Sequence, residues 1–438
     1  MIAYVGLDVH QDTVTAAFLR RDGSEPVKRW QVANNLPGAT ELAERLSALG
    51  SANGTSELHI GLESTGLCGW HLAKLLSDPD AVASCQSKVY LLNPQRVKSW
   101  RKTMGTGGKN DWRDPFVIAD FIRLGRGLPS PFCVDMVYAP LQRLTRFRFY
   151  VAHSLAREKT YFLTMLFLPF SAYGQAEPFS DLFGSSSLSI LEGYSTEDLV
   201  QAKLTDLADT LHRSSRGQLA DETGTAKALQ QAAQDSYHLD HALHDPMRLV
   251  LQKTMLNIRG LQSTLKIVDA TIARELKGIP QTLDSVPGLG PVWTAGLISE
   301  IGDISRFPND AALASYAGLV WNGSESGQFQ AQDVSLSKKG CVYLRYYLVE
   351  GANSVRAHCA EYAAYYKAKY DQTPKHAHQR ALILTARKLV RLVYPLLRYG
   401  QLYQKPEDRS SRQDGPLPHN ARPGRPRNYP LAKAVGQG

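Results

Sequence analysis

The chain has 438 residues, of which 43% are hydrophobic and 21% charged, a globular composition that excludes a disordered scaffold and allows two or three cores. Its 50 lysines and arginines exceed its 41 aspartates and glutamates, giving a net charge of +9. That excess favours polyanionic partners such as nucleic acid or an anionic membrane, although a merely basic enzyme is also common.

Cysteine usage and hydropathy indicate which structural supports and which cellular compartment to expect. The five cysteines are odd in number and form no CxxC pair, so neither a disulfide framework nor a zinc site is indicated. A reducing cytoplasm fits this usage. Because no stretch of about 18 apolar residues occurs, we expect a soluble protein without a membrane segment.

The first 140 residues predict an α/β domain. "IAYVGLDVH", "TVTAAFLRRDG" and "VKRWQVAN" read as three consecutive antiparallel strands. They are followed by a helix-period segment "GATELAERLSAL", a strand "LHIGLE", a helix over 70–76 and a strand "KVYLLNP". Strands separated by helices indicate a partly parallel sheet covered on both faces.

From about residue 140 helical patterns replace the strand signals. The Gly/Ser/Asp-rich stretch 168–225 predicts loops around short helices. In 251–276 the spacing of the apolar residues fits a coiled-coil seam and an ordinary amphipathic helix about equally well. These residues are Leu251, Ile258, Leu261, Leu265, Val268 and Ile272.

Three later features follow, of which the first and the last suggest contacts with nucleic acid. Pro287, Gly288 and Gly290 predict a tight hairpin between two helices, whose exposed amides can face a DNA phosphate, although such a turn is usually only a turn. Residues 376–399 predict a helix with a basic edge, interrupted near Pro395. The proline-rich, basic stretch after residue 400 predicts a disordered arm that contacts nucleic acid.

Two carboxylates are associated with the predicted strands. Asp8 is placed in the middle of the first strand, where a charge needs a partner, and Glu63 ends the strand "LHIGLE". In α/β proteins such strand ends are where active sites assemble. A single strand-end carboxylate is more often a capping or loop residue.

"TGGKNDWRDP" adds two more acids, Asp111 and Asp114, three residues apart near a predicted helix start. On a helix they would share one face, which is destabilising unless a cation joins them. Taken alone, the pair would be a solvated helix start. Lys109 and Arg113 would then lie where a phosphate arrives.

The order of these acids along strands and helices is that of a ribonuclease-H-like nuclease fold. Four carboxylates on adjacent elements can hold two divalent cations for phosphoryl transfer. Mg²⁺ suits them better than zinc because no His or Cys joins the set, and Mn²⁺ is the alternative. Asp12, in a turn, and Asp120, six residues beyond Asp114, are left out of this set.

A second group of residues surrounds Ser326, which precedes a glycine in a short polar loop. The nearby cations Lys338, Lys339 and Arg345 could stabilise a phosphate under attack by the serine. A Ser-Gly pair is ordinarily a turn, so the residues alone are only suggestive. No His/Asp spacing indicates a hydrolase triad.

Several motifs, in this order, resemble the Piv/MooV-type DNA invertases and their insertion-sequence transposase relatives, which act as bridge-RNA-guided recombinases. The motifs are "GLDVHQ", "LESTG", "LLNPQRVK", "KNDWRD", "VPGLGPVWTAGLISEIGDISRF", "YAGLV", "LSKKGCVYLRYYLVEGA" and "ARKLVRLVY". The resemblance spans about residues 1 to 400.

The resemblance implies three segments, and a basic, proline-rich tail is expected after them. The three are a RuvC-like acidic domain over 1–140, a helical coiled-coil and oligomerisation region over 141–280, and a mainly helical serine-bearing transposase domain with a helix-hairpin-helix-like segment over 281–400. The tail covers 401–438. The resemblance implies the acidic tetrad Asp8, Glu63, Asp111 and Asp114, and a nucleophile at Ser326 that forms a covalent phosphoserine intermediate with DNA. It also implies donor and target DNA, a structured noncoding RNA, Mg²⁺, a homo-oligomer from dimer to tetramer, and a nucleoid-associated place in the bacterial cytoplasm.

This chain departs from the family pattern in two places. Asn110 and Pro115 replace the usual threonine and alanine around the acid pair, a change that alters the helix start but keeps the acids. The usual "SSGG" reads "SESGQ", so Ser324 competes with Ser326, and we favour Ser326 because it directly precedes glycine. Residues 170–245 and the tail match nothing in the pattern.

Three other functions remain open. A site-specific invertase that works without RNA has the same sequence features. In a noncatalytic nucleic-acid-binding protein, the basic hairpin and tail would hold DNA and the four acids would have no function. An actin-like ATPase shares the three-strand opening but should carry a second glycine-rich phosphate loop after a domain repeat, and the sequence has no such repeat.

Overall fold

The computed structural model describes residues 1–64, 66–104, 112–125, 127–133, 136–321, 325–326, 329–330, 336–337 and 339–405, with backbone alone at 325–326 and 329–330. The chain divides into one unit of residues 1–275 with 298–308 and another of 276–297 with 309–438. The finer domain boundaries expected from the sequence stay predictions. No helix within the described ranges has the length and hydropathy needed to cross a bilayer.

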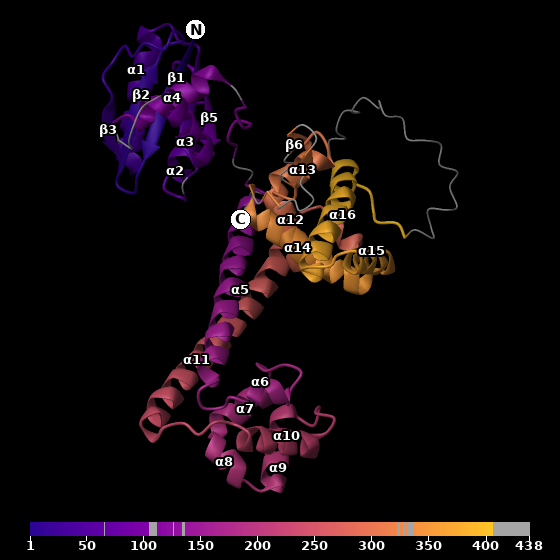
Figure 1. Cartoon of the computed structure of the whole chain (residues 1–438). Coiled ribbons are helices and arrows are strands. Elements are labelled where there is room, and N and C mark those ends of the chain that lie inside the picture. Colours follow the sequence, from indigo (N-terminus) through magenta and orange to yellow (C-terminus); the bar gives the residue numbers. More distant parts are fainter. Residues whose placement is uncertain are drawn as a thin grey trace, which may run out of the picture. The chain divides into compact units, whose positions relative to one another are not determined.

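The N-terminal part is a mixed five-stranded sheet in the order β3-β2-β1-β4-β5 (Figure 1). β1 pairs antiparallel with β2, as the sequence predicts, and parallel with β4. The remaining pairs are antiparallel β2–β3 and parallel β4–β5. The bounds are β1 Ile2–Val9, β2 Thr13–Leu19, β3 Trp30–Ala33, β4 Glu57–Glu63 and β5 Gln86–Leu92.

Helices cover both faces of this sheet, because the side chains of a strand alternate between its faces. Val5 and Leu7 of β1 belong to one core with Leu42 of α1 and Leu72 of α2. Tyr4 of β1 belongs to a second core with residues of α3 and α4. These helices are α1 Leu36–Ala52, α2 Trp70–Leu76, α3 Pro94–Thr103 and α4 Asp114–Leu124. The predicted partly parallel, two-sided sheet is therefore confirmed.

The middle of the chain is helical, and 168–225 contains short helices, as predicted. The two long helices α5 and α11 run antiparallel, since Arg148 pairs with Asp269 at 2.5 Å while Asn257 donates to Glu158 at 2.7 Å. The bounds are α5 Ala139–Leu166, α6 Tyr173–Ala176, α7 Ser185–Gly193, α8 Thr196–Gln201, α9 Leu204–Ser215, α10 Glu222–Gln234 and α11 His241–Leu276.

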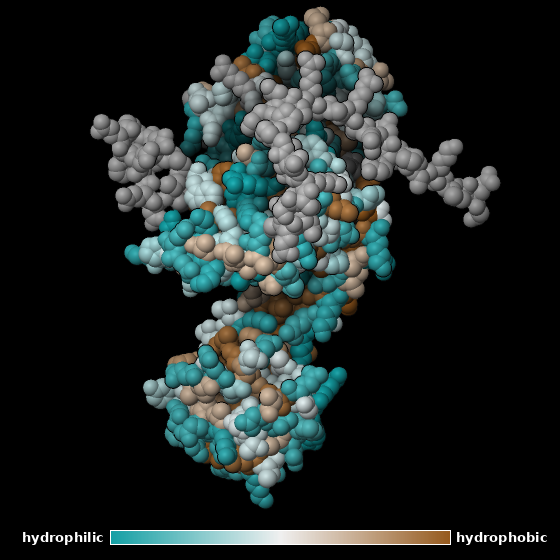
Figure 2. All heavy atoms as spheres, turned by 90° about the vertical axis from the view of Figure 1, so that its right-hand side faces the viewer, coloured by the Kyte–Doolittle hydropathy of each residue, from teal (hydrophilic) through white to brown (hydrophobic). Residues whose placement is uncertain are grey.

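The α5–α11 pair buries only part of its apolar surface. Ile258 and Ile272 of the predicted seam are fully buried, whereas Leu261 and Leu265 are half-buried. Other apolar side chains remain exposed, so that hydrophobic residues are visible on the narrow stretch formed by these helices (Figure 2). Examples are Phe147, Tyr150, Leu256 and Ile267. The oligomerisation role expected of this region stays a prediction.

The C-terminal part is mainly helical and carries a short hairpin of two strands. Its elements are η1 Leu283–Ser285, α12 Pro291–Ile301, η2 Ile304–Arg306, α13 Asp310–Tyr316, β6 Glu325–Ser326, β7 Phe329–Gln330, α14 Val342–His358, α15 Ala360–Asp371 and α16 Ala377–Tyr399. The predicted interruption near Pro395 is wrong, because α16 continues to Tyr399. The buried neighbours Val393 and Leu396 hold this turn by packing, which offsets the backbone bond that proline removes.

The glycine turn also differs from its prediction. Gly288 and Gly290 follow the short 3-10 helix η1 and not a full helix, so only α12 completes the expected hairpin. Gly288 has φ +91°, and a Cβ there would lie 2.8 Å from the carbonyl oxygen of Ser354. Gly288 is thus packed against α14 and is needed for this close approach, whereas a Cβ on Gly290 would meet no described atom within 4 Å.

Candidate functional site

Asp8 and Glu63 lie side by side on one face of the sheet. Asp8 is the penultimate residue of β1, not a mid-strand residue as predicted, and Glu63 ends β4. The parallel register pairs Gly6 with Gly61 and Leu7 with Leu62, which brings the next residues of the two strands together. Since side chains alternate, both acids share the face of Gly6 and Gly61.

That face is the one covered by α4. A Cβ on Gly6 would lie 1.8 Å from the carbonyl oxygen of Pro115, and a Cβ on Gly61 would touch Ile118 at 3.1 Å. Gly6 and Gly61 therefore let α4 lie directly on β1 and β4. Each glycine is two residues before the acid of its strand. Asp114 begins this helix, so Asp8, Glu63 and Asp114 belong to three elements, β1, β4 and α4, that meet on this face, here called the acidic edge.

Replacing Gly6 with alanine should disrupt this arrangement, because the added methyl group would meet backbone atoms of α4 that cannot rotate away. We expect a loss of about 3 kcal/mol in the free energy of unfolding, measured as a lower urea midpoint of the full chain. The matched control is Gly260→Ala within α11, where a Cβ has no described atom within 4 Å. Alanine should be neutral or slightly stabilising there. Equal midpoints for the two variants would refute the close packing of α4.

Asp114 is held by an arginine that the sequence analysis missed. Its side chain is 4% exposed and forms an ion pair at 2.9 Å with Arg101 of α3. Arg113, predicted to meet a phosphate, is exposed at the N-cap of α4. Lys109 and Asp111 lie outside the described residues. Asp114 is the first residue of α4, so the helical face predicted to be shared by Asp111 and Asp114 stays a prediction.

Loss of the Arg101 side chain should destabilise the fold, because it would leave the buried carboxylate of Asp114 without this counter-ion. For Arg101→Ala we expect a decrease of about 3 kcal/mol in the free energy of unfolding in the presence of EDTA. Lys102→Ala, on the exposed side of the same helix, should change it by less than about 0.5 kcal/mol. A loss of similar size in both variants would show that the ion pair is not what holds Asp114.

His10 is the second missed neighbour. Its Nε2 atom lies 3.3 Å from Oδ2 of Asp8, whose side chain is 15% exposed. The spacing of two residues at a strand end was the available signal, since it puts both side chains on one side.

The two acids left out of the set are accounted for differently. Asp12 is exposed beyond β1. Asp120 is buried in α4, where Arg123 pairs with it at 2.6 Å.

The donor chemistry of this edge suits a hard divalent cation. Asp8, Glu63 and Asp114 offer only carboxylate oxygens, the ligands that Mg²⁺ and Mn²⁺ prefer. Within the described ranges, however, no group of three or more His, Cys, Asp or Glu side chains is arranged to hold a metal ion. The predicted fourth ligand, Asp111, falls outside those ranges. The donor type therefore fits the expected metal, while the complete ligand set stays a prediction.

The serine lies in the other unit, in a hairpin formed by β6 and β7. Ser326 is in β6, and its backbone pairs with Phe329 of β7. Ser324 and Lys338 are outside the described residues. Lys339 is exposed, whereas Arg345 donates to the carbonyl oxygen of Ala317 at 3.2 Å. That bond gives Arg345 a structural role in addition to any contact with phosphate.

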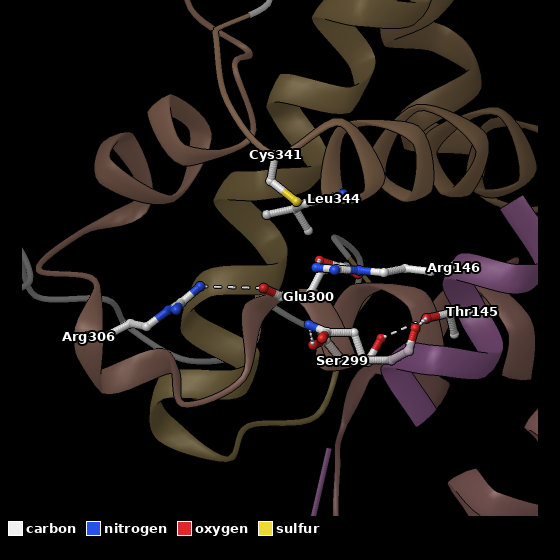
Figure 3. Close-up of polar contacts among 8 residues, drawn as sticks. Thr145, Arg146, Ser299, Glu300, Arg306, Cys341 and Leu344 are labelled. Carbon is white, nitrogen blue, oxygen red and sulfur yellow. Dashed lines mark hydrogen bonds and ion pairs between the residues drawn. The ribbon is translucent and has the colours of Figure 1, made fainter. Parts of the chain in front are cut away.

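A buried ion pair fixes the C-terminal end of α12 to the start of α5 (Figure 3). Glu300 has a fully buried side chain, and Arg146 donates to its two oxygens at 2.7 and 3.0 Å. Next to it, the hydroxyl groups of Thr145 and Ser299 are 3.1 Å apart. Glu300 belongs to the motif "GLISEIGDISRF", but its partner is more than 150 residues away, so no local signal could have identified the pair.

Comparison with known families covers both candidate sites. Residues 5–170, which contain the acidic edge, match a family model described as "Transposase", of the DEDD type of IS110. Residues 280–367, which contain the glycine turn and Ser326, match "Transposase IS116/IS110/IS902 family". The two matches together cover more than half of the chain. The chain belongs to the IS110 family of transposases. The predicted likeness to insertion-sequence transposases is thereby confirmed at the level of the family.

Curated relatives of this IS110-family chain match it over shorter stretches. A "Probable family 20 transposase" of Pseudomonas aeruginosa is 31% identical over 112 residues, 24% of this chain and 33% of the relative. The "Transposase for insertion sequence element IS1111A" of Coxiella burnetii is 27% identical over 128 residues, 28% of this chain and 34% of the relative. The matched stretch spans about a third of each of these relatives.

Proposed function

We propose that the chain is an insertion-sequence recombinase that cuts and rejoins DNA with Ser326 and the acids Asp8, Glu63, Asp111 and Asp114. The observation that carries the proposal is the shared sheet face of Asp8 and Glu63 at the start of α4, in a chain whose two family matches are both to transposases. Carboxylates gathered in this way are suited to phosphoryl transfer. The net charge of +9 suits a nucleic-acid substrate.

The proposed chemistry begins with attack by the Ser326 hydroxyl oxygen on a DNA phosphorus atom. A bond from phosphorus to the serine oxygen forms, the bond to one DNA oxygen breaks, and that DNA strand ends in a hydroxyl group after accepting a proton. Attack by the hydroxyl of another strand then reverses the step and releases the serine. A divalent cation bound at the acidic edge would neutralise negative charge on the phosphate. Lys338, Lys339 and Arg345 are proposed to contribute positive charge near the serine.

The proposal includes a guide RNA and an oligomer. We infer from the resemblance that a structured noncoding RNA pairs with donor and target DNA, and that a dimer or tetramer completes the active sites. The glycine turn at Gly288 and Gly290, with Lys109 and Arg113, is proposed to contact nucleic acid.

The proposal can be tested with protein purified from cells that carry its native flanking DNA. Bound RNA is sequenced, and the complex is incubated with donor and target plasmids and Mg²⁺. We expect a defined RNA and joined donor–target products. Joined products without RNA would support an RNA-independent invertase, and DNA binding without any cut strand would support a noncatalytic binding protein.

A further inference from the structure

A row of tyrosines and lysines on α15 has no role in the chemistry above. Tyr362, Tyr365, Tyr366, Lys369 and Tyr370 are spaced three and four residues apart, so they share one face of the helix. Such a stripe normally forms a core. Here only Tyr362 is fully buried, at 2% exposed, while Tyr370 at the end of the row is 45% exposed. The row therefore runs from the interior out to solvent.

Cations lie over the faces of these rings. Arg356 of α14 is 4.3 Å from the ring centre of Tyr366, and Lys388 of α16 is 4.8 Å from that of Tyr365. The hydroxyl of Tyr366 is also hydrogen-bonded to Nδ1 of His378 at 2.6 Å. Three helices thus hold the inner tyrosines in place, which leaves a rigid base for the outer ring of Tyr370, 6.0 Å from Tyr366.

The charge around the outer end of the row is positive. The two acids of α15 are paired, Glu361 with Lys388 at 2.7 Å and Asp371 with Lys367 at 3.0 Å. Lys375, in the exposed turn between α15 and α16, adds a positive charge there. The first turn of α16 contains no acidic residue. An exposed aromatic ring beside positive charge is the combination that binds single strands, since every base has a face to stack and every nucleotide a phosphate.

We propose that Tyr366, Lys369, Tyr370 and Lys375, named here the tyrosine–lysine surface, bind a single-stranded nucleic acid. A base stacks on Tyr370, and phosphates lie beside Lys369 and Lys375. The tyrosine–lysine surface includes neither the proposed acids nor Ser326, and binding to it requires no strand cleavage. Binding in EDTA therefore tests it independently of the proposed function.

The first test is photocrosslinking of the full chain to 12-nucleotide single strands that carry 5-iodouracil, one DNA and one RNA, in EDTA. Peptide mapping should find crosslinks to Tyr370 or its neighbours in 365–380. Crosslinking of DNA alone or RNA alone would identify which strand the surface takes. Crosslinks confined to other parts of the chain would overturn the proposal.

The second test compares affinities by fluorescence anisotropy. Tyr370→Ala should weaken binding of single strands about tenfold, whereas Tyr370→Phe keeps the ring and should stay within roughly twofold of wild type. Lys375→Gln should lower the slope of log affinity against log salt by about 0.7. The matched controls are Tyr237→Ala, at a side chain 78% exposed before α11, and Lys266→Gln on α11.

Two results would contradict stacking on Tyr370. One is equal affinity of wild type and Tyr370→Ala for single strands. The other is an equal loss for single strands and for a 12-base-pair duplex, whose bases are already stacked on one another.

Discussion

Replacing Asp8 with asparagine is expected to lower DNA strand exchange on the order of 10³-fold, because the change removes one negative charge from the acidic edge without altering the size of the side chain. The strand position makes this a strong test, since Asp8 lies beside Glu63 on the α4 face. The measurement is the rate of joined product from donor and target plasmids with saturating Mg²⁺.

Asp12→Asn is the matched control for this prediction. It makes the same chemical change four residues away, at an exposed position beyond β1. Its strand exchange should equal that of the wild type. If Asp8→Asn retained full exchange, the acids on the sheet would have no part in the chemistry. If Asp8→Asn and Asp12→Asn lost strand exchange equally, the loss could not be assigned to the acidic edge.

The second large effect is expected from Ser326→Ala, which should abolish strand exchange and covalent attachment of DNA to the protein. Alanine has no hydroxyl oxygen to bond to phosphorus, so no phosphoserine can form. Ser324→Ala, two residues earlier in the same segment, should retain both activities. The measurement is the protein–DNA adduct on a denaturing gel after quenching.

The outcome for the two serines decides between them directly. Loss of the adduct in Ser324→Ala and its retention in Ser326→Ala would move the nucleophile to Ser324. If the adduct formed in both variants, neither Ser324 nor Ser326 would be the nucleophile. RNA binding should be unchanged in both variants, which separates a chemical defect from a failure to assemble.

The parts of the fold that depend on short-range patterns could be predicted from the sequence. The three antiparallel opening strands, the partly parallel sheet and its two covered faces were predicted from alternating residues and from helices between strands, and they are confirmed. The order of the strands within the sheet was not predicted. The continuation of α16 through Pro395 was not predictable, because buried neighbours outweigh the local effect of proline there.

The candidate site was predicted only in part for the same reason. Glu63 could be placed at a strand end, whereas Asp8 was predicted in mid-strand, and the face that the two acids share depends on the register of β1 with β4. Arg101 could not be assigned to Asp114, since the two residues belong to different helices. The pair of Arg146 and Glu300 joins residues from distant parts of the chain, a contact that no local pattern reports.

The most direct test of the account is peptide mass spectrometry of the complex quenched during strand exchange, with Mg²⁺ and the native flanking DNA present. The account predicts a nucleotide mass attached to the peptide that contains Ser326, absent from the Asp8→Asn complex and present in the Asp12→Asn complex. Joined DNA products that accumulate while the Ser326 peptide stays unmodified at every time point would contradict it.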